Sequence, residues 1–452
     1  MSRGGLPYGL RSPGPLPGLE ETIRELERFL SGPPEAGSDL RSFLLVERYL
    51  AMALGHRPTP LRRSLDRALC VAAGLAATAG HRAEVREVRA GPPPGPGRHL
   101  LFFGFPWSDK RHTGILEGLL GHLALEEVLA VTHREDVFEA LAAHPVPRFL
   151  LRLPRLAPPA PGAARDPGEA RTLATAALLL GAATRLLEEL RPRSVLTTQD
   201  FHLHDQAFAR AARALGVPSV THQHGMIPPE PLSLYRFLFS DRMAVWGRGS
   251  ARLMARFVDP ARLWVVGTDR FDGLRSPRPS AERDLLVLAL SPEPGDGNRR
   301  LVDAVSRGLA ESPVPALRRI LKLHPSMDPG PWERPASRAA GGGWEVLRGA
   351  GGILLPRTRF LLARRSTITL DAAVAGASVL ELGTSDLGPL PGLLEELPES
   401  VVEPHAAAAE IARRLADPAV EAGVLGRQAA ALDAEIEPGC AAVREVALLR
   451  NL

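Results

Sequence analysis

The chain has 452 residues, of which 45% are hydrophobic and 23% are charged. This composition is typical of a globular protein and excludes a largely disordered chain, and at about 150 residues per domain the length predicts two or three domains. The formal net charge of +4 is too small to indicate a nucleic-acid partner. The two cysteines, Cys70 and Cys440, give no disulfide framework, which favours a reducing compartment.

The first 97 residues predict a loose tail followed by a helical extension. Residues 1–18 are dominated by Gly, Pro and Arg, whereas apolar residues within 19–90 recur at three- and four-residue spacing. No N-terminal segment has the order of a signal peptide, and the most apolar stretch, 173–187, is too short to span a bilayer. We therefore expect a cytoplasmic protein, for which peripheral contact with the inner membrane face stays open.

From residue 98 onward, short apolar strands alternate with helices, which is typical of doubly wound parallel sheets. One Rossmann-like domain is predicted over 98–275 and a second over 284–452, with the 276–280 break between them. The predicted strands lie at 99–104, 127–132, 194–198, 217–222, 243–246, 263–266, 285–290, 318–323, 344–347, 359–363 and 377–382. The predicted helices lie at 113–123, 135–143, 171–190, 204–215, 248–257, 299–310, 366–375, 405–416 and 439–452. The Pro-rich piece at 153–167 is expected to be an exposed insertion, and neither a GxGxxG fingerprint nor a P-loop is present.

In the second domain, two polar segments follow predicted strands. The strand 318–323 contains Lys322 and leads into His324-Pro325, so these side chains are expected at its carboxyl end. Ser366 and Thr367 open a predicted helix, whose free N–H groups and positive dipole end suit phosphate. We predict a phosphate-binding edge, with an ordinary helix cap as the alternative for Ser366 and a surface lysine as the alternative for Lys322.

In the first domain, Gln223-His224-Gly225 follows the strand 217–222. A glycine lets the backbone turn sharply, and a histidine with a pKa of about 6.5 can act as a general base at neutral pH. The alternative for His224 is a structural residue at the domain edge. Asp200, which follows the strand 194–198, is the competing base.

Two further predictions concern the first domain. Lys110 and His112 lie in the loop after its first strand, and only this position singles them out. The run His202-Leu203-His204-Asp205 could indicate a metal site, but no further ligand stands out, so a helix start is favoured and no metal is predicted. The run 267–272 is expected to shape the hinge between the domains.

The ordered set of motifs over about residues 190–450 resembles the GT-B glycosyltransferases that build bacterial surface polysaccharides. These include sialyl- and Kdo-transferases and CDP-glycerol glycerophosphotransferases with "HG" and "HP" motifs. The resemblance implies two Rossmann-like domains that face a cleft, with the nucleotide donor in the second domain and the acceptor in the first.

The resemblance also implies roles for individual residues. Those that would contact the donor phosphate are His324, Pro325, Ser366 and Thr367, and Asp371 would place the ribose or its own helix. His224 would deprotonate the acceptor hydroxyl, and the residues on the acceptor side would be Lys110, His112, Gln223 and Gly225. In sialyltransferase-like branches an acidic pair supplies the base, but this chain has no such pair at Asp200.

The implied activity is transfer of a sugar from a nucleotide-sugar donor to a hydroxyl of a capsule, lipopolysaccharide or lipid-linked glycan acceptor. Neither a metal nor another cofactor is expected. The alternatives are a CDP-polyol phosphotransferase of the same fold, an isomerase similar to UDP-GlcNAc 2-epimerase, and a non-catalytic scaffold protein. The missing acid pair favours the scaffold, whereas four residues in separate segments oppose it: His224, Lys322, His324 and Ser366.

Overall fold

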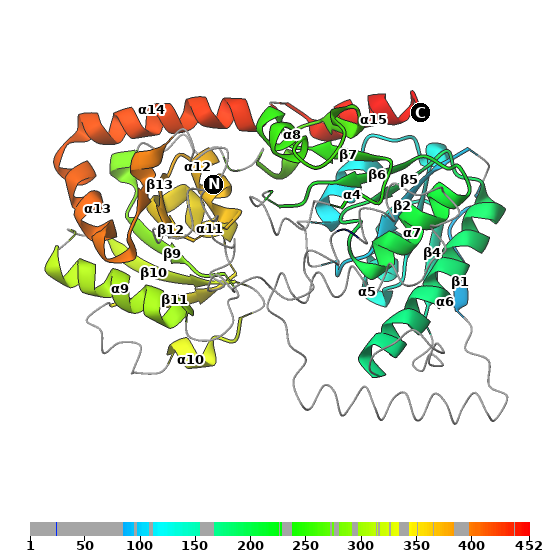
Figure 1. Cartoon of the computed structure of the whole chain (residues 1–452), viewed down its shortest axis with the longest axis horizontal. Coiled ribbons are helices and arrows are strands. Elements are labelled where there is room, and N and C mark those ends of the chain that lie inside the picture. The colour runs from blue at the N-terminus through cyan, green and yellow to red at the C-terminus, as the bar shows by residue number, and fades with distance from the viewer. Residues whose placement is uncertain are drawn as a thin grey trace.

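The protein has two α/β lobes, each built around one sheet (Figure 1). This computed structural model describes residues 24, 85–94, 97–107, 112–153, 167–225, 227, 237–271, 274, 280–291, 297–312, 314, 317–324, 327–333, 343–349, 351–364, 366–383, 397–437 and 439–452. The tail and helices predicted before residue 85, apart from Arg24, lie outside the described residues, as does most of the Pro-rich insertion.

The first lobe contains an eight-stranded sheet in the order β1-β4-β3-β2-β5-β6-β7-β8. Its strands are β1 (Arg86–Ala90), β2 (His99–Phe103), β3 (Val128–Thr132), β4 (Arg148–Arg152), β5 (Ser194–Thr197), β6 (Ser219–His222), β7 (Arg242–Val245) and β8 (Leu263–Val265). Neighbouring strands are parallel except for β1, which pairs antiparallel with β4. The strand order reverses between β2 and β5, and ligands of doubly wound sheets bind beyond the carboxyl ends of the strands at such a point.

Helices cover both faces of this sheet because successive strand residues point to opposite sides. Leu101 and Phe103 pack with α4 (Thr113–Leu120), α5 (Glu135–Ala140) and α15 (Ala441–Leu449). Leu100 and Phe102 pack with α6 (Pro167–Leu190) and α7 (Leu203–Ala214). The helix α8 (Arg248–Met254) packs against β7 and β8.

The second lobe contains a six-stranded, fully parallel sheet in the order β11-β10-β9-β12-β13-β14. Its strands are β9 (Leu285–Ala289), β10 (Arg318–Leu323), β11 (Glu345–Arg348), β12 (Thr358–Ala363), β13 (Ser378–Leu382) and β14 (Val401–Val402). The helices α9 (Gly297–Glu311) and α13 (Ala407–Ala416) cover one face. The other face carries α11 (Gly351–Leu354), α12 (Ile368–Val374) and α14 (Pro418–Glu435), and α10 (Gly330–Glu333) follows β10. Here the strand order reverses between β9 and β12.

The predicted pair of Rossmann-like sheets is confirmed, with local differences. Residues 86–90 form β1 and are not helical as predicted, because this polar segment gains its order from pairing with β4. The strand β4 and the helix α14 were not predicted. A start signal for α14 is nevertheless present in Asp417-Pro418, since the Asp417 carboxylate accepts a hydrogen bond from Ala419 N at 2.9 Å.

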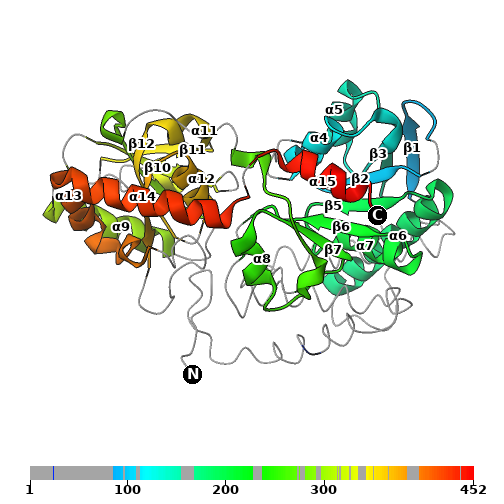
Figure 2. The same cartoon turned by 90° about the horizontal axis from the view of Figure 1, so that it is seen from above.

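The end of the chain returns from the second lobe to the first. Helix α14 runs along the second lobe toward α8, and α15 packs against α4 of the first lobe (Figure 2). Asp269 caps α15 by accepting hydrogen bonds from Ala441 N and Ala442 N at 2.6 and 3.2 Å. Helix α15, which belongs to the segment 284–452, therefore packs with the first lobe.

Apolar packing joins the two lobes. Trp246 and Phe271, which follow β7 and β8, lie in one buried cluster with Ala363 at the end of β12 and Ile368 at the start of α12. Each of these residues lies at or just after the carboxyl end of a strand or in the loop that follows it. Residues that follow β7 and β8 of the first lobe therefore contribute to the contact with the second lobe.

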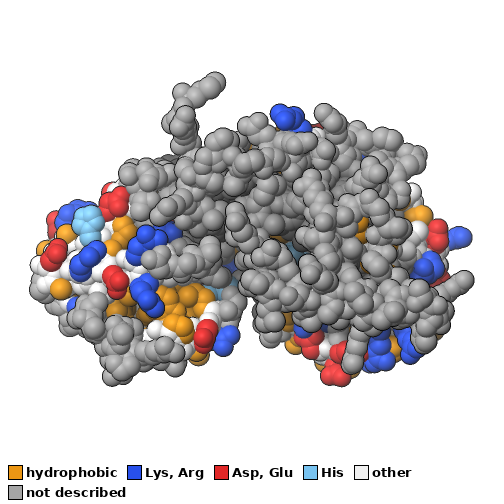
Figure 3. Space-filling model, turned by 60° about the horizontal axis from the view of Figure 1, so that its bottom comes forward, with side chains coloured by type: hydrophobic (Ala, Val, Ile, Leu, Met, Phe, Trp, Pro, Cys, Tyr) orange, Lys and Arg blue, Asp and Glu red, His pale blue; other side chains and the backbone are white. Residues whose placement is uncertain are grey.

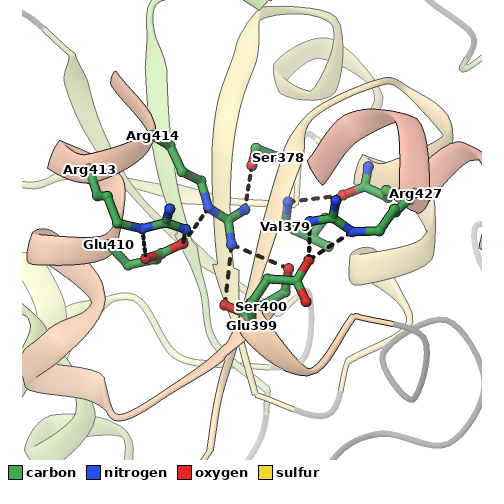
Figure 4. Close-up of polar contacts among 9 residues, drawn as sticks. Ser378, Val379, Glu399, Ser400, Glu410, Arg413, Arg414 and Arg427 are labelled. Carbon is green, nitrogen blue, oxygen red and sulfur yellow. Dashed lines mark hydrogen bonds and ion pairs between the residues drawn. The ribbon is translucent and has the colours of Figure 1, made fainter. Parts of the chain in front are cut away.

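A buried polar network holds the far end of the second sheet (Figure 4). The Arg414 side chain is completely buried and donates to Glu410 and to the Ser378 hydroxyl, each at 2.7 Å. It also donates to the Ser400 hydroxyl at 3.3 Å and to the Glu399 carbonyl at 3.4 Å. Ser378 begins β13, so this network lies at the opposite end of the sheet from the carboxyl edge and holds the fold together.

Candidate functional site

The carboxyl edge of the first sheet brings together residues predicted from three separate segments. Gln223, His224 and Gly225 follow β6, Asp200 follows β5, and His112 lies in the segment between β2 and α4. Lys110 lies outside the described residues. These segments surround the point at which the strand order reverses between β2 and β5.

Five aromatic and imidazole rings form a closed circuit at this edge. His112 stacks on Phe105 with 3.6 Å between the ring centroids and on His224 with 4.4 Å. The circuit continues from His224 to Phe201 at 6.2 Å, then to His202 at 5.0 Å, and returns to Phe105 at 5.2 Å. We name these residues the ring circuit, and it joins the loops that follow β2, β5 and β6. Sequence reasoning missed Phe105 and Phe201, although each lies just after a predicted strand.

A second ring stack lies beside the ring circuit. His133, which directly follows β3, lies parallel to His204 with 3.8 Å between the ring centroids. Burial lowers the pKa of His133 to about 3 and the pKa values of His202 and His204 to about 4, so these imidazoles are uncharged at neutral pH. His133 was not among the predicted site residues, although its position directly after the predicted strand 127–132 could have indicated it.

Two buried carboxyl groups lie below these rings. Asp200 is 4% exposed, and it accepts a hydrogen bond of 2.6 Å from Ser240 N. Burial raises the pKa of Asp200 to about 6 and raises that of Asp205 well above its usual value, with the charge of Asp200 as a second cause for Asp205. The hydrogen bond ties the Asp200 carboxyl group to the backbone before β7, so this group is poorly placed to reach an acceptor.

Gln223 fixes the turn that presents His224. Its side-chain oxygen accepts from Trp246 N at 2.9 Å, and its side-chain nitrogen donates to the Gly225 carbonyl at 2.9 Å. The Trp246 indole donates to the Gln223 carbonyl at 2.8 Å. Because its amide group is bonded within the protein, Gln223 shapes the turn, and through Trp246 it links the turn to the packing between the lobes.

The carboxyl edge of the second sheet carries the predicted phosphate-binding residues. Lys322 is half-buried and shares a face of β10 with Ile320, whose apolar cluster reaches Trp246 of the first lobe. The His324 carbonyl accepts from Met327 N at 2.9 Å and closes a turn directly after β10. Pro325 lies outside the described residues.

Ser366 and Thr367 lie in the loop between the carboxyl end of β12 and α12, on one side of the β9/β12 reversal point. The helix predicted from 366 begins at Ile368, so the N-cap position falls to Thr367. The Thr367 side chain does not cap the helix, because Thr369 N donates to the Ser366 carbonyl and Leu370 N to the Thr367 carbonyl. Both hydroxyl groups therefore precede the first turn of α12.

Asp371 joins the two lobes. The Arg270 guanidinium donates two hydrogen bonds to its carboxylate, at 2.8 Å from Nε and 2.7 Å from Nη2. Arg270 belongs to the short 3-10 helix Asp269–Phe271 at the end of the first lobe, within the run predicted to shape the hinge. A bidentate pair of this kind has a fixed geometry, so Asp371 positions α12 relative to the first lobe.

Three further features of the described residues concern the surface between the lobes, metal-binding groups and membrane-spanning helices. Figure 3 shows an indentation between the two lobes, with basic and hydrophobic side chains visible on the second lobe beside it. Among the residues that the structure describes, no group of three or more His, Cys, Asp or Glu is arranged to hold a metal ion. Within the same ranges, no helix has the length and apolarity needed to cross a membrane.

Comparisons with known proteins identify the fold. The chain is similar to the glycosyltransferase from Rickettsia africae ESF-5, with 10% identity, a TM-score of 0.52, and 79% of this chain and 98% of that chain covered. It is similar to Anabaena Alr3699/HepE in complex with UDP-glucose, with 14% identity, a TM-score of 0.52 and coverage of 78% and 100%. It is also similar to a candidate UDP-N-acetylglucosamine 2-epimerase from Listeria monocytogenes, with 14% identity, a TM-score of 0.52 and coverage of 79% and 96%. No protein-family model and no curated protein matches the sequence.

The chain therefore has the GT-B fold, in which two Rossmann-like α/β lobes face each other. Nucleotide-sugar glycosyltransferases and UDP-GlcNAc 2-epimerases share this fold. Identities between 10% and 14% establish the fold alone.

The buried histidines predict how stability depends on pH. Because the pKa of His133 falls to about 3, this imidazole is neutral in the folded state but protonated in the unfolded state below pH 6.5. Unfolding then takes up a proton, so the contribution of His133 to the free energy of unfolding falls as the pH is lowered from 6.5 toward 3. The raised pKa values of Asp200 and Asp205 act in the opposite direction as the pH rises above about 4.

We expect His133→Phe, which keeps a ring in the stack, to flatten the pH dependence of unfolding by about one proton between pH 4.5 and 6.5. Urea denaturation of both proteins across this range measures the change. An identical slope in the variant and the wild type would show that His133 is protonated equally in the folded and unfolded states.

Proposed function

We propose that this protein is a glycosyltransferase that transfers a sugar from a nucleotide-sugar donor to a hydroxyl group of a glycan or lipid-linked glycan. One observation carries the proposal: each lobe has predicted site residues at the carboxyl ends of its parallel strands, with His224 after β6 of the first lobe and Lys322 and His324 at the end of β10 of the second. A base on one lobe and cationic or hydrogen-bonding groups on the other suit transfer between two substrates in the intervening space. The similar structures include one in complex with UDP-glucose, which supports a nucleotide-sugar donor.

The proposed reaction is a direct displacement. A nitrogen of His224 takes the proton of the acceptor hydroxyl, and the hydroxyl oxygen forms a bond to the anomeric carbon of the donor. The bond between that carbon and the phosphate oxygen breaks, and its electron pair leaves with the nucleotide diphosphate. Lys322, His324 and the hydroxyl groups of Ser366 and Thr367 stabilise the charge that develops on this leaving group. The proposal involves no metal, and it assigns the Arg270–Asp371 pair to lobe placement.

A nucleotide-sugar isomerase is the second candidate. The observation that favours it is the buried Asp200 carboxyl group, whose pKa of about 6 suits proton transfer near neutral pH, beside a second buried carboxyl group, Asp205. Inversion at a carbon atom requires a proton to leave that carbon and return to its other face. Incubation with UDP-GlcNAc in D₂O, without acceptor, separates the two candidates. An isomerase incorporates deuterium into the sugar, whereas the proposed transferase incorporates none.

Melting temperatures measured with CMP, CDP, UDP and GDP identify the donor nucleotide. The nucleotide that binds raises the melting temperature, because a ligand that binds only the folded state stabilises that state. Acceptor-dependent release of that nucleotide from its sugar conjugate then tests transfer. Binding of CDP-glycerol with release of CMP would assign the chain to polyol phosphate transfer instead. If none of the nucleotides raises the melting temperature, the chain is a scaffold protein and the proposal is wrong.

We expect His324→Ala and Ser366→Ala each to weaken binding of the stabilising nucleotide by about tenfold or more. Each change removes a hydrogen bond to a charged phosphate, which contributes about 1.5–3 kcal/mol. Isothermal titration calorimetry measures the change. Ser312→Ala is the matched control, because Ser312 follows α9 and leads toward the amino end of β10. Equal affinities in all four proteins would reject this edge as the nucleotide site.

A further inference from the structure

We propose that His112 is a positioning residue, which holds the His224 imidazole in one orientation by stacking on it. The benefit to catalysis rests on the proposed function, in which His224 is the base. The stacking itself is a property of the ring circuit and is tested separately.

The geometry of the stack supports this role. Phe105 and His112 lie 3.6 Å apart at an interplanar angle of 7°, and His112 and His224 lie 4.4 Å apart at 24°. His112 is therefore sandwiched between the other two rings. His112 is 4% exposed, so its ring is buried between its two neighbours.

The local backbone delivers the His112 ring to the stack. His112 occupies the N-cap position of α4, but its side chain does not cap the helix. The neighbouring Thr113 hydroxyl donates to the Trp107 carbonyl at 3.2 Å and anchors this turn to the loop after β2. The imidazole is thus directed away from the helix axis and toward Phe105 and His224.

A second element fixes the backbone on the other side of the stack. Gln223 bonds to both Trp246 and Gly225, so the turn that contains His224 has a defined backbone path. The remaining freedom of His224 is rotation of its side chain, which the face of His112 restricts. A base must direct one nitrogen at the acceptor proton, so restriction of this rotation favours the productive geometry.

The test compares His112→Phe, which keeps a planar ring, with His112→Leu, which fills the space without one, and with His112→Ala. The measurement is the rate at which diethyl pyrocarbonate modifies His224, located by tandem mass spectrometry at several pH values. His222 serves as the internal reference, because it is buried and paired with Glu445 of α15. His144→Ala is the control for loss of a histidine outside the ring circuit, and thermal melting verifies that each variant is folded.

We expect the modification rate of His224 to rise by about fivefold in the Leu and Ala variants, which corresponds to loss of about 1 kcal/mol of stacking. The rate and its pH midpoint stay within about twofold of wild type in His112→Phe. A Phe variant that behaves like the Leu variant would overturn the proposal in favour of hydrogen bonding by His112. An unchanged rate in the Leu variant would show that the stack does not restrain His224.

Turnover then separates this proposal from the proposed function. If both hold, kcat falls in His112→Leu and recovers in His112→Phe, with the donor KM unchanged. If His224→Ala leaves turnover intact while the modification rates change as expected, the proposed base is wrong and the stacking role stands. If His224→Ala abolishes turnover but His112→Leu changes neither turnover nor modification, the positioning role is wrong.

Discussion

Replacing His224 by alanine is expected to lower turnover by about 10²- to 10⁴-fold, because proton transfer by a positioned side chain contributes this much to the rate. Nucleotide affinity should remain close to that of the wild type, since the proposed nucleotide site lies on the other lobe. Steady-state release of nucleotide in the presence of acceptor, together with calorimetry of nucleotide binding, measures both quantities. A loss confined to affinity would contradict the role of base.

Asp200→Asn is the competing variant for the same measurement. The Asp200 carboxyl group is buried and accepts a hydrogen bond from Ser240 N, so we expect a smaller effect on turnover and a clear effect on stability. A near-normal rate in His224→Ala together with a large loss in Asp200→Asn would transfer the role of base to the acid. Equal losses in both variants would indicate that the two groups act as a couple.

Replacing Arg414 by methionine is expected to destabilise the protein by about 1–3 kcal/mol for each buried group left without a partner, because the Ser378 and Ser400 hydroxyl groups lose their donor. Arg414 is completely buried and holds Glu410, Ser378 and Ser400 together (Figure 4). Methionine fills most of the volume, so the loss reports on the polar network more than on a cavity. Chemical denaturation followed by circular dichroism measures the free energy of unfolding.

Arg413 provides a matched control for this change. It pairs with the same carboxylate, Glu410, at 2.7 Å, but half of its side chain is exposed. Solvent screens such a pair, so Arg413→Met should leave stability almost unchanged. Equal destabilisation in the two variants would show that Glu410 pairing, and not burial of Arg414, determines stability at this end of the sheet.

The sequence predicted the sheets well because their strands are buried on both faces. Continuous apolar runs such as 99–103 and 285–289 stand out against the polar loops, and helices alternate with them regularly. The strand β1 was mispredicted because its residues are mostly exposed and its order comes from β4, which lies about 60 positions away in the sequence. The helix α14 was missed because its Ala- and Gly-rich sequence has little apolar periodicity.

The sequence predicted which residues of the candidate site follow strands, but it did not predict how their side chains contact one another. Reading the positions after each strand located His224, His324 and Ser366, since the sheet itself brings such positions to one edge. The ring circuit could not be predicted, because it depends on how side chains from three loops stack on one another. The pairing of Asp371 with Arg270 also joins residues about 100 positions apart, and no local pattern indicates it.

The docking of α15 has a consequence for folding during synthesis. One apolar face of the first sheet is covered partly by Ala442, Val446 and Leu449, which the ribosome adds after all of the second lobe. Domains generally fold as their residues emerge, but this lobe cannot cover that face until residue 449 has emerged. The first lobe should therefore remain incompletely packed while the second lobe folds, and a pause in translation before α15 has emerged would prolong the exposure of a surface prone to aggregation.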